Sequence, residues 1–515
     1  MIEPQNLAHM LRITRIKYGR STAICYGQKK LTYDELDDAS DNFCSSLMRL
    51  GIEKGQRVAI LLFNRPEFII SYFGILKAGA TIVPLNTMLK TEEIRYMLED
   101  AGAVAIVTSS SFMDIACDLK AKLKNLKHVI LLGSEMSEEA VDFPGMIRDT
   151  VSQNRVKDID AEDLAVIMYT SGTTGHPKGA MLTHKNLLSN ARSSAKAIKI
   201  THWDCFVCVL PLFHSFAATV CMLLPIYCGA KIIIFVSPRP FKRVMRTMIR
   251  KRATIFTGIP SIFNILKDSK LPALLTAPVI SRIANPIRLC ISGAAALPIE
   301  TLVEFEKRFK IPLIEGYGLT EASPVVSLNP LKGERKPGSI GLPLPDVEVK
   351  AVNDNGEDVP LGEIGELLVK GPNVMKGYLN QPQANAQTIK DNWLYTGDLA
   401  KFDSDGYIYI VGRKKEMVNV RGLNVYPKEL EDVLYEHPYV KEAAVIGVID
   451  KHKGEVPKGF VTLKDGVQKK ADEVEHELLL FLRDRLALYK IPKRIEIIES
   501  FPKTSTGKIL KRNLQ

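Results

Sequence analysis

Residues 58–108 contain a repeating order of short apolar runs and longer amphipathic runs. The apolar runs are VAILL at 58–62, TIVPL at 81–85 and VAIVT at 104–108, and between them lie SYFGILKAG at 71–79 and EEIRYMLEDAG at 92–102. Short β-rich runs that are separated by helical runs are typical of parallel sheets with crossover connections. The stretch therefore predicts a wound α/β sheet.

A similar order of runs returns between residues 231 and 318, which predicts a second wound sheet. From Pro337 to Val411 the runs are shorter and lie between turn residues, which is typical of a small antiparallel β unit. A further αβ pattern follows, and a chain of 515 residues is too long for one core. We therefore predict an α/β protein with a large N-terminal domain (1–414) of two wound αβ sheets plus a small β unit. A small, mobile α+β C-terminal domain (415–515) completes the prediction.

The composition is typical of a folded, water-soluble protein, with 46% hydrophobic and 25% charged residues. The 69 Lys and Arg exceed the 58 Asp and Glu by 11, a moderate excess with no accompanying nucleic-acid-binding signature. Pro, His, Gly and Lys interrupt the apolar region 206–236, so no transmembrane helix is expected. The amino terminus lacks the apolar core of a secretion signal. We expect a cytoplasmic protein that binds no nucleic acid.

Eight cysteines are scattered along the chain, several of them inside apolar runs. This usage is typical of buried free thiols in a reducing compartment. Cys205 and Cys208 form a CxxC, but no second pair and no His pair at zinc spacing accompanies it. Neither a metal site nor a redox role is therefore predicted for them.

Residues 169–179, YTSGTTGHPKG, combine three glycines with hydroxyl side chains and Lys178 directly after an apolar run. Glycines let backbone amides turn toward an anion, while hydroxyl and ammonium groups can donate to phosphate oxygens. The spacing matches neither the GxxxxGK[ST] phosphate loop nor the GxGxxG dinucleotide loop. On these residues alone, a phosphate-binding loop and a polar surface loop are equally open.

Four further motifs follow this loop in order: GYGLTE at 316–321, YTGD at 395–398, GRKKEMVNVRG at 412–422 and PKTSTGK at 502–508. Together the five motifs resemble those of the adenylate-forming superfamily of acyl-CoA synthetases, luciferases and adenylation domains. The resemblance covers essentially the whole chain, and EGYGLTEASPV with KEMVNVRGLNVYPKELE is most similar to bacterial fatty-acid–CoA ligases. It implies that a carboxylate attacks the α-phosphate of ATP to form an acyl-adenylate, from which the thiol of coenzyme A displaces AMP.

The resemblance also implies roles for residues around the nucleotide. Tyr317 would contact adenine, Thr320 would bind the α-phosphate, and Glu321 would bind Mg²⁺, which prefers oxygen ligands. The other residues that would border the nucleotide or grip its phosphates are Gly293, Ala294, Gly318, Thr170, Ser171, Gly172, Thr173, Thr174, Gly175 and Lys178.

Later motifs imply the ribose site and a moving domain. Asp398 would accept hydrogen bonds from ribose hydroxyls, with help from Arg413. Lys508, which would otherwise be interpreted as part of a frayed basic tail, would neutralise the carboxylate and the α-phosphate during adenylation. Because Lys508 lies 330 residues after the phosphate loop lysine, the small domain would rotate about a hinge at Lys415. After rotation, Gly422 would line the tunnel for the pantetheine arm of CoA.

The last candidate catalytic residue, His214, lies in the apolar run LPLFHSF. The resemblance places it at the acyl pocket and not in an acid–base role, since a carboxylate nucleophile has no proton to remove. The run that follows it and residues 293–298, GAAALP, are rich in small and apolar side chains, with no charge to select an amino acid. A medium- or long-chain fatty acid is the leading substrate, and a coumarate-like aryl acid is the alternative.

Other assignments stay open on the sequence. A luciferase-like oxygenase would share every motif, and a free-standing enzyme could load a carrier protein in place of CoA. A catalytically silent nucleotide-binding protein would tolerate loss of the motif lysines and the motif glutamate, all of which are present. Asn392 and Asn419 depart from the family pattern, outside the assigned chemistry. A homodimer and a peripheral contact with a membrane surface also stay open, and no segment stands out as an anchor.

Overall fold

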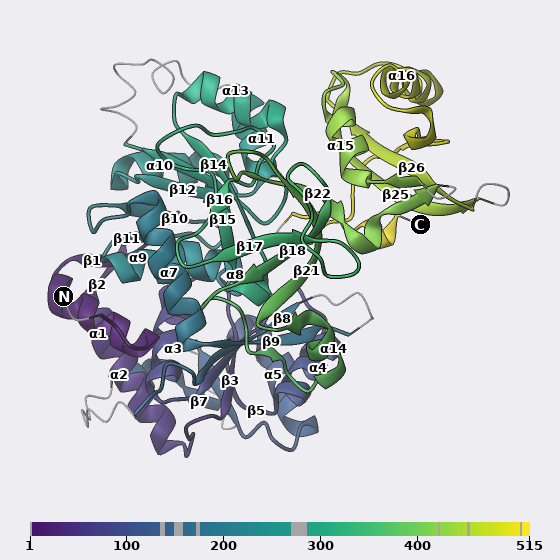
Figure 1. The fold of residues 1–515 in the computed structure, drawn as a ribbon. Coiled ribbons are helices and arrows are strands. Elements are labelled where there is room, and N and C mark those ends of the chain that lie inside the picture. The colour runs from purple at the N-terminus through teal and green to yellow at the C-terminus, as the bar shows by residue number, and fades with distance from the viewer. Residues whose placement is uncertain are drawn as a thin grey trace.

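The computed structural model describes residues 3–133, 140–148, 158–170, 176–268, 286–420, 423–450, 454–504 and 507–514. Figure 1 shows a main body of sheets with helices around them, and a separate small domain formed by the last part of the chain. This is the α/β architecture, with a large N-terminal and a small C-terminal domain, that the sequence predicts.

The first wound sheet has eight strands. They are β3 (Arg57–Leu61), β4 (Thr81–Pro84), β5 (Ala103–Ser109), β6 (His128–Leu132), β7 (Ala140–Asp142), β8 (Leu164–Thr170), β9 (Lys178–Thr183) and β19 (Gly377–Tyr378). Their order is β19-β9-β8-β4-β3-β5-β6-β7, and all neighbours are parallel except β8 with β9 and β9 with β19. The three apolar runs within residues 58–108 thus form the buried middle of this sheet, as predicted.

The second wound sheet has nine strands. They are β1 (Thr22–Tyr26), β2 (Lys29–Thr32), β10 (Cys205–Cys208), β11 (Lys231–Ile234), β12 (Ile255–Gly258), β13 (Leu289–Ser292), β14 (Leu313–Gly318), β15 (Val325–Leu328) and β16 (Leu342–Pro343). The order is β16-β15-β14-β13-β12-β10-β11-β1-β2. Six neighbouring strands, β14 to β1 in this order, are parallel, so their carboxyl ends lie at one edge.

Helices form three layers around the two sheets. They are α1 (Leu7–Tyr18), α2 (Tyr33–Arg49), α3 (Pro66–Lys77), α4 (Thr91–Ala101), α5 (Met113–Lys122), α6 (Phe143–Arg148), α7 (His184–Ile198), α8 (Ser215–Ala217), α9 (Leu224–Cys228), α10 (Phe241–Lys251), α11 (Pro260–Asp268), α13 (Ile299–Phe309) and α14 (Pro382–Thr388). One core joins both sheets through α2, α3, α7 and α9, a second lies under α10, α11 and α13, and a third lies under α4 and α5. The N-terminal domain is therefore built as α–β–α–β–α. No helix of the described part of the chain is long and apolar enough to cross a bilayer.

Local sequence sets the start of α7, which borders the candidate site. The Thr183 hydroxyl accepts a hydrogen bond from the Asn186 backbone amide, and the Asn186 side chain accepts one from the Thr183 amide. This reciprocal pair satisfies backbone donors that a helix start leaves without partners. A π-helical segment, η2 (Ala218–Leu223), connects α8 to α9 and packs against α7.

The small β unit is antiparallel, as predicted. Its strands are β17 (Glu348–Val352), β18 (Gly365–Lys370), β20 (Ile389–Lys390), β21 (Trp393–Phe402) and β22 (Ile408–Arg413). Asp391 and Asn392 join β20 to β21 in a two-residue turn with positive φ at both positions, 51° and 64°. Asn tolerates this left-handed backbone, which accounts for its presence where the family pattern has glycine.

The C-terminal part has its own sheet and core. It contains η5 (Lys414–Glu416), β23 (Val418–Val420), β24 (Leu423–Val425), α15 (Pro427–Tyr435), β25 (Val440–Asp450), β26 (Gly454–Leu463), α16 (Ala471–Arg483), η6 (Leu488–Lys490), β27 (Ile495–Ile497) and η7 (Lys511–Asn513). The core side chains beneath α15 and α16 all come from residues 418–495. The boundary at residue 415 and the mobility of this domain stay predictions.

Candidate active site

A cavity of about 1270 Å³ opens at the carboxyl ends of the wound sheets. Its walls come from loops after β8, β10, β13 and β14, from the small β unit, and from the tail of the C-terminal domain. Ligands of open α/β sheets bind in such a position. The volume exceeds the roughly 300–1,000 Å³ typical of a pocket for one small molecule, so two ligands can share it.

The two ends of the glycine-rich loop lie at this cavity. Thr170 ends β8, Lys178 begins β9, and the two residues are paired across the hairpin. The predicted phosphate-binding residues between them, Ser171, Gly172, Thr173, Thr174 and Gly175, lie outside the described residues. The hairpin thus delivers both ends of the loop to one place in the cavity.

Lys178, Tyr378 and Glu321 form a connected group on one wall. The Tyr378 hydroxyl donates a hydrogen bond of 2.7 Å to the Glu321 carboxylate, and the Lys178 ammonium lies 5.3 Å from the centre of the Tyr378 ring. Burial and the Glu321 charge raise the pKa of Tyr378, so its hydroxyl stays a donor at neutral pH. One aromatic side chain therefore contacts both the predicted phosphate lysine and the predicted metal ligand.

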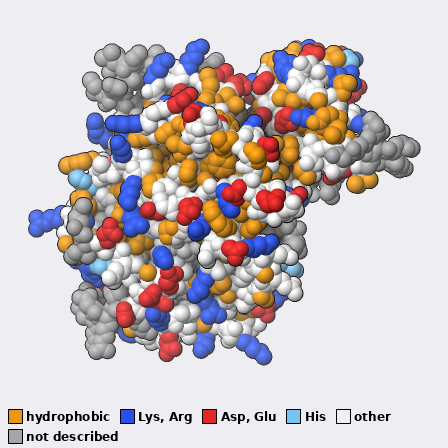
Figure 2. Space-filling view, in the orientation of Figure 1, with side chains coloured by type: hydrophobic (Ala, Val, Ile, Leu, Met, Phe, Trp, Pro, Cys, Tyr) orange, Lys and Arg blue, Asp and Glu red, His pale blue; other side chains and the backbone are white. Residues whose placement is uncertain are grey.

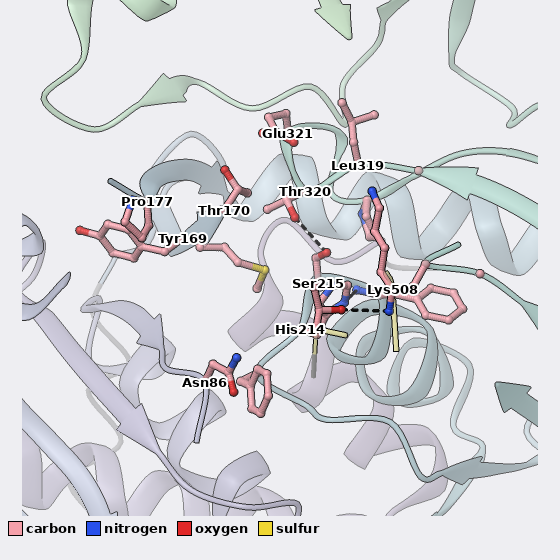
Figure 3. Close-up of a pocket in the computed structure, with 18 of the residues that line it drawn as sticks. Asn86, Tyr169, Thr170, Pro177, His214, Ser215, Leu319, Thr320, Glu321 and Lys508 are labelled. Carbon is pink, nitrogen blue, oxygen red and sulfur yellow. Dashed lines mark hydrogen bonds between the residues drawn. The ribbon is translucent and has the colours of Figure 1, made fainter. Parts of the chain in front are cut away.

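Thr320 and Glu321 lie in the turn η4 (Thr320–Ala322), directly after β14. Figure 3 shows the Thr320 side chain directed at Ser215, and the two hydroxyl oxygens are 3.1 Å apart. A Cβ atom at Gly318 would lie 2.2 Å from the Pro324 carbonyl oxygen, so only glycine allows the chain to fold back here. The tight turn that Gly318 allows thereby directs Thr320 and Glu321 toward the cavity.

The adenine and ribose candidates are already joined to one another. The Tyr317 hydroxyl donates a hydrogen bond of 2.5 Å to one oxygen of Asp398, and the Arg413 Nε atom lies 3.3 Å from the other. Asp398 and Arg413 are direct partners on β21 and β22, whereas Tyr317 comes from β14. The contact joins the small β unit to the second wound sheet and fixes the position of the Asp398 carboxylate at the cavity wall.

Lys508 lies in the same cavity, on a hairpin in which its amide donates to the Thr504 hydroxyl at 3.0 Å. The Lys508 side chain presents surface to the open cavity, yet protein surrounds it on most sides. This burial lowers the pKa of Lys508 to about 8, and the positive charge of Arg413 makes the second-largest contribution. Lys415 also lines the cavity, and burial lowers its pKa. The structure thus brings the tail lysine to the motif residues of the large domain.

The tail that carries Lys508 is held to its own domain by Lys511. The Lys511 ammonium lies 2.7 Å from a Glu431 oxygen on α15 and 3.1 Å from a Glu416 oxygen in η5. Lys503, at the start of the hairpin, lies 2.6 Å from a Glu442 oxygen on β25. These ion pairs fix the position of the tail relative to the C-terminal sheet.

His214 lies where the cavity passes from polar to apolar lining. Its Nδ1 atom accepts a hydrogen bond of 3.3 Å from the Phe216 amide at the start of α8. Desolvation lowers the pKa of His214 to about 4, so the imidazole is neutral at pH 7. A neutral ring whose Nδ1 is already engaged suits a place in the wall better than proton transfer.

The apolar part of the cavity lies between α7 and the η2–α9 segment. Its lining side chains include Met168, Ser194, Ile198, Val220 and Leu224. Gly293 and Ala294 lie at the other side, next to the Phe216 ring, which a Cβ at Gly293 would approach to 2.7 Å. The cavity is therefore lined by apolar side chains along α7, and it is narrow at residue 293.

Among the predicted site residues, the structure brings all the described ones to this single cavity, and Gly422 lies outside the described residues. The sequence did not single out Tyr378, Ser215 or Ser194. Ser215 follows His214 directly, and this adjacency was a usable signal. Nothing local distinguishes Tyr378 or Ser194 from other tyrosines and serines, because only the packing of distant elements turns them to the cavity.

Comparison with known proteins identifies the family of this chain. The family model for the AMP-binding enzyme matches residues 14–379, and the model for the AMP-binding enzyme C-terminal domain matches residues 429–508. The chain belongs to the AMP-binding enzyme family. The solved structures that it resembles are those of adenylate-forming ligases.

Several individual proteins are similar over nearly their whole length. The long-chain-fatty-acid–CoA ligase of Bacillus subtilis (strain 168) is 35% identical over 99% of this chain and 94% of its own. The feruloyl-CoA synthase of Amycolatopsis sp is 35% identical over 95% of this chain and 94% of its own. The crystal structure of ATP-bound MatB from Rhodopseudomonas palustris superposes with a TM-score of 0.91 at 31% identity, over 99% of this chain and 98% of that one. An anthranilate CoA ligase, AuaEII, in complex with anthranoyl-AMP gives a TM-score of 0.90 at 29% identity, over 100% of this chain and 97% of that one.

Proposed function

We propose that this protein is an ATP-dependent fatty acid–CoA ligase. A fatty acid and ATP give an acyl-adenylate and pyrophosphate, and CoA then gives the acyl-CoA thioester and AMP. The observation that carries the proposal is the single cavity that combines Lys508, the Thr320–Glu321 turn and the Asp398–Arg413 pair with an apolar extension along α7. The full-length similarity to long-chain-fatty-acid–CoA ligases supports the same acid class.

In the adenylation step, a carboxylate oxygen bonds to the α-phosphorus and the bond to pyrophosphate breaks. Negative charge gathers on phosphate oxygens, so fixed cations and hydroxyl donors supply the stabilisation. Lys508 would face the carboxylate and the α-phosphate, Thr320 would donate to the α-phosphate, and Lys178 would face the pyrophosphate. The neutral His214 would leave the carboxylate ionised, and the step needs no base.

The site also fits a Mg²⁺ ion that arrives with ATP. Within the described ranges, no group of three or more His, Cys, Asp or Glu residues is placed to hold a metal by itself. Mg²⁺ usually binds through one or two carboxylates together with substrate phosphates, and Glu321 is such a carboxylate. When bound there, the ion would neutralise phosphate charge.

For the second half-reaction, the C-terminal domain would rotate about Lys415. The sulfur of CoA bonds to the acyl carbon, the bond to AMP breaks, and the thiol proton leaves to solvent. The present arrangement places Lys508 in the cavity and so matches the adenylation step. Rotation would withdraw Lys508 and open a path for the pantetheine arm.

The test is AMP release from Mg·ATP and CoA across straight-chain acids from acetate to oleate, with benzoate and coumarate beside them. We expect a maximum at medium or long chains. A carrier protein offered in place of CoA separates the acceptor alternatives. If none of the acids is turned over with either CoA or the carrier protein, the proposal is contradicted.

One observation favours a second candidate, an aryl acid–CoA ligase. Ser194 is one of the residues beside the apolar extension, it is 1% exposed, and its hydroxyl has no hydrogen-bond partner among the described residues. A buried hydroxyl without a partner is unfavourable, and a hydroxylated aromatic acid could satisfy it. If Ser194→Ala lowers kcat/KM about tenfold for coumarate and leaves palmitate unchanged, the aryl acid is the better substrate class.

Replacing Tyr378 by Phe is expected to weaken Mg·ATP binding about tenfold. The substitution keeps the ring near Lys178 but removes a hydrogen bond to a charged carboxylate, which contributes about 1.5–3 kcal/mol. Calorimetric titration of ATP with and without Mg²⁺ measures the effect directly. Tyr96→Phe, which also borders the cavity, is the matched control. If binding without Mg²⁺ weakens as much as binding with it, Tyr378 does not act through Glu321.

The rate of adenylation is expected to fall at alkaline pH. Because the pKa of Lys508 is lowered to about 8, its ammonium form predominates below that pH and is lost above it. We expect kcat/KM for ATP, which reports the free enzyme, to fall about tenfold per pH unit above this pKa. Bound phosphates favour the ammonium, so kcat should hold to higher pH. Arginine stays charged in this pH range, so the Lys508→Arg variant should not show the alkaline fall in kcat/KM. If the pH profile of this variant is unchanged, another group causes the fall.

A further inference from the structure

The positive charge of this protein is concentrated in one segment. Residues 205–299 contain twelve Lys and Arg but a single acid, Asp268, so their formal charge of +11 equals that of the whole chain. The remaining residues hold 57 Lys and Arg against 57 Asp and Glu. The excess is therefore not spread over the surface, as an even distribution would predict.

Within this segment, the charge gathers on α10 and the turn before it. The exposed cations, here called the α10 cations, are Arg239, Lys242, Arg243, Arg246, Arg250 and Arg252. None of them forms an ion pair with a carboxylate in the described part of the chain. Figure 2 shows blue side chains projecting from the edge of the molecule where Figure 1 places α10.

The opposite face of α10 is anchored in the protein. Val244 and Met248 are buried, and Phe241 and Met245 pack against the same core under the second sheet. The helix is therefore a fixed part of the fold and presents its cations as a rigid row. Residues three or four apart, such as Arg243 and Arg246, lie on one side of the helix.

The row begins at the edge of the molecule that carries the active site. The turn before α10 follows the carboxyl end of β11, and the neighbouring parallel strand β10 leads into the loop that holds His214. Val236 lies in this turn, close in sequence to Arg239, and is 50% exposed. Exposed cations with an exposed apolar side chain therefore follow the same edge of the second sheet as the loop that holds His214.

We propose that the α10 cations form a docking surface for the anionic lipid headgroups of a bilayer. An unpaired row of fixed cations complements a surface of negative charge, and each basic residue near such a surface strengthens binding about fivefold. The choice of a bilayer over an acidic protein rests on the proposed function, because a long-chain acid partitions into membranes. Docking through this edge would place the cavity near its substrate.

The experiment measures vesicle binding by the full-length protein without substrate. Sedimentation with phosphatidylglycerol–phosphatidylcholine vesicles is compared with pure phosphatidylcholine vesicles, at low and at high salt. We expect binding to the anionic vesicles only, and release at high salt. Arg243→Gln with Arg246→Gln should lower the partition coefficient about 25-fold. Lys124→Gln with Lys127→Gln removes the same charge from exposed positions before β6 and should lower it less than twofold.

Activity and unfolding measurements separate this inference from the proposed function. Both double variants should convert octanoate at the wild-type rate in the absence of vesicles, and unfold at the wild-type temperature. Equal losses of vesicle binding in the two pairs, or no binding by the wild type, would overturn the docking surface. The docking surface would also be overturned if an acidic carrier protein bound to the enzyme and displaced it from the vesicles. Failure of every acid to react would overturn the ligase proposal while the vesicle result still decides the surface.

Discussion

Lys508→Ala is expected to lower the rate of acyl-adenylate formation about 100- to 1,000-fold, the usual effect of removing one fixed donor from a developing negative charge. The substitution removes the cation that Lys508 presents to the cavity from the C-terminal tail. Pyrophosphate exchange into ATP measures this half-reaction alone. The second half-reaction, followed with supplied acyl-adenylate and CoA, should change less than threefold, because the lysine would then be outside the site.

Lys441→Ala is the matched control for this prediction, since Lys441 is an exposed lysine of the same domain. It should leave both half-reactions unchanged. Equal losses in the two half-reactions of Lys508→Ala would mean that the residue supports the folded tail and not the first chemical step. The unfolding temperature of the variant distinguishes these readings further.

Ser194→Phe is expected to convert the enzyme to short-chain acids. The new ring would project into the apolar extension between α7 and the η2–α9 segment, which Ser194 borders. Burial of each methylene contributes about 0.8 kcal/mol, so excluding four of them lowers kcat/KM for palmitate more than 100-fold. Butyrate, which needs only the part near His214, should keep kcat/KM within about threefold.

Acyl-CoA formation with acids of increasing length measures the effect of the Ser194 variants. Ser194→Ala changes the same atom without filling the space and should keep the wild-type length profile. If palmitate and butyrate lose activity in parallel in Ser194→Phe, the acyl chain does not lie along α7. A normal butyrate rate also shows that the variant is folded.

Much of the fold could be predicted from residue patterns. The order of β-rich and helical runs in residues 58–108 predicts a wound sheet because helices must cover each crossover, and the structure confirms both wound sheets. The turn-rich stretch after Pro337 predicts an antiparallel unit for an equally local reason. The two-residue edge strand β16 and the π-helical η2 carry no such signal, because β16 is defined only by its pairing with β15 and η2 by its packing against α7.

The site was predictable only where a motif carries its own chemistry. GYGLTE and YTGD place four hydroxyl groups and two carboxylates beside glycines, and the structure gathers them in one cavity. Tyr378 is a counterexample, because its position depends on β19 pairing with β9, far away in sequence. The concentration of charge on α10 is visible in the sequence, but its meaning depends on which cations find partners after folding.

The ion pairs of Lys511 have a consequence for the timing of catalysis. Both of its partners, Glu416 and Glu431, follow the proposed hinge, so the tail would travel with its domain and no pair would break there on rotation. Across the two domains, the Lys464 ammonium lies 3.8 Å from a Glu300 oxygen, and both side chains are partly exposed, so this ion pair is weak. Breaking this ion pair on rotation would therefore cost little free energy. The ligand in the cavity would then decide which orientation of the C-terminal domain is favoured, since only a modest difference in its affinity for the two orientations is needed.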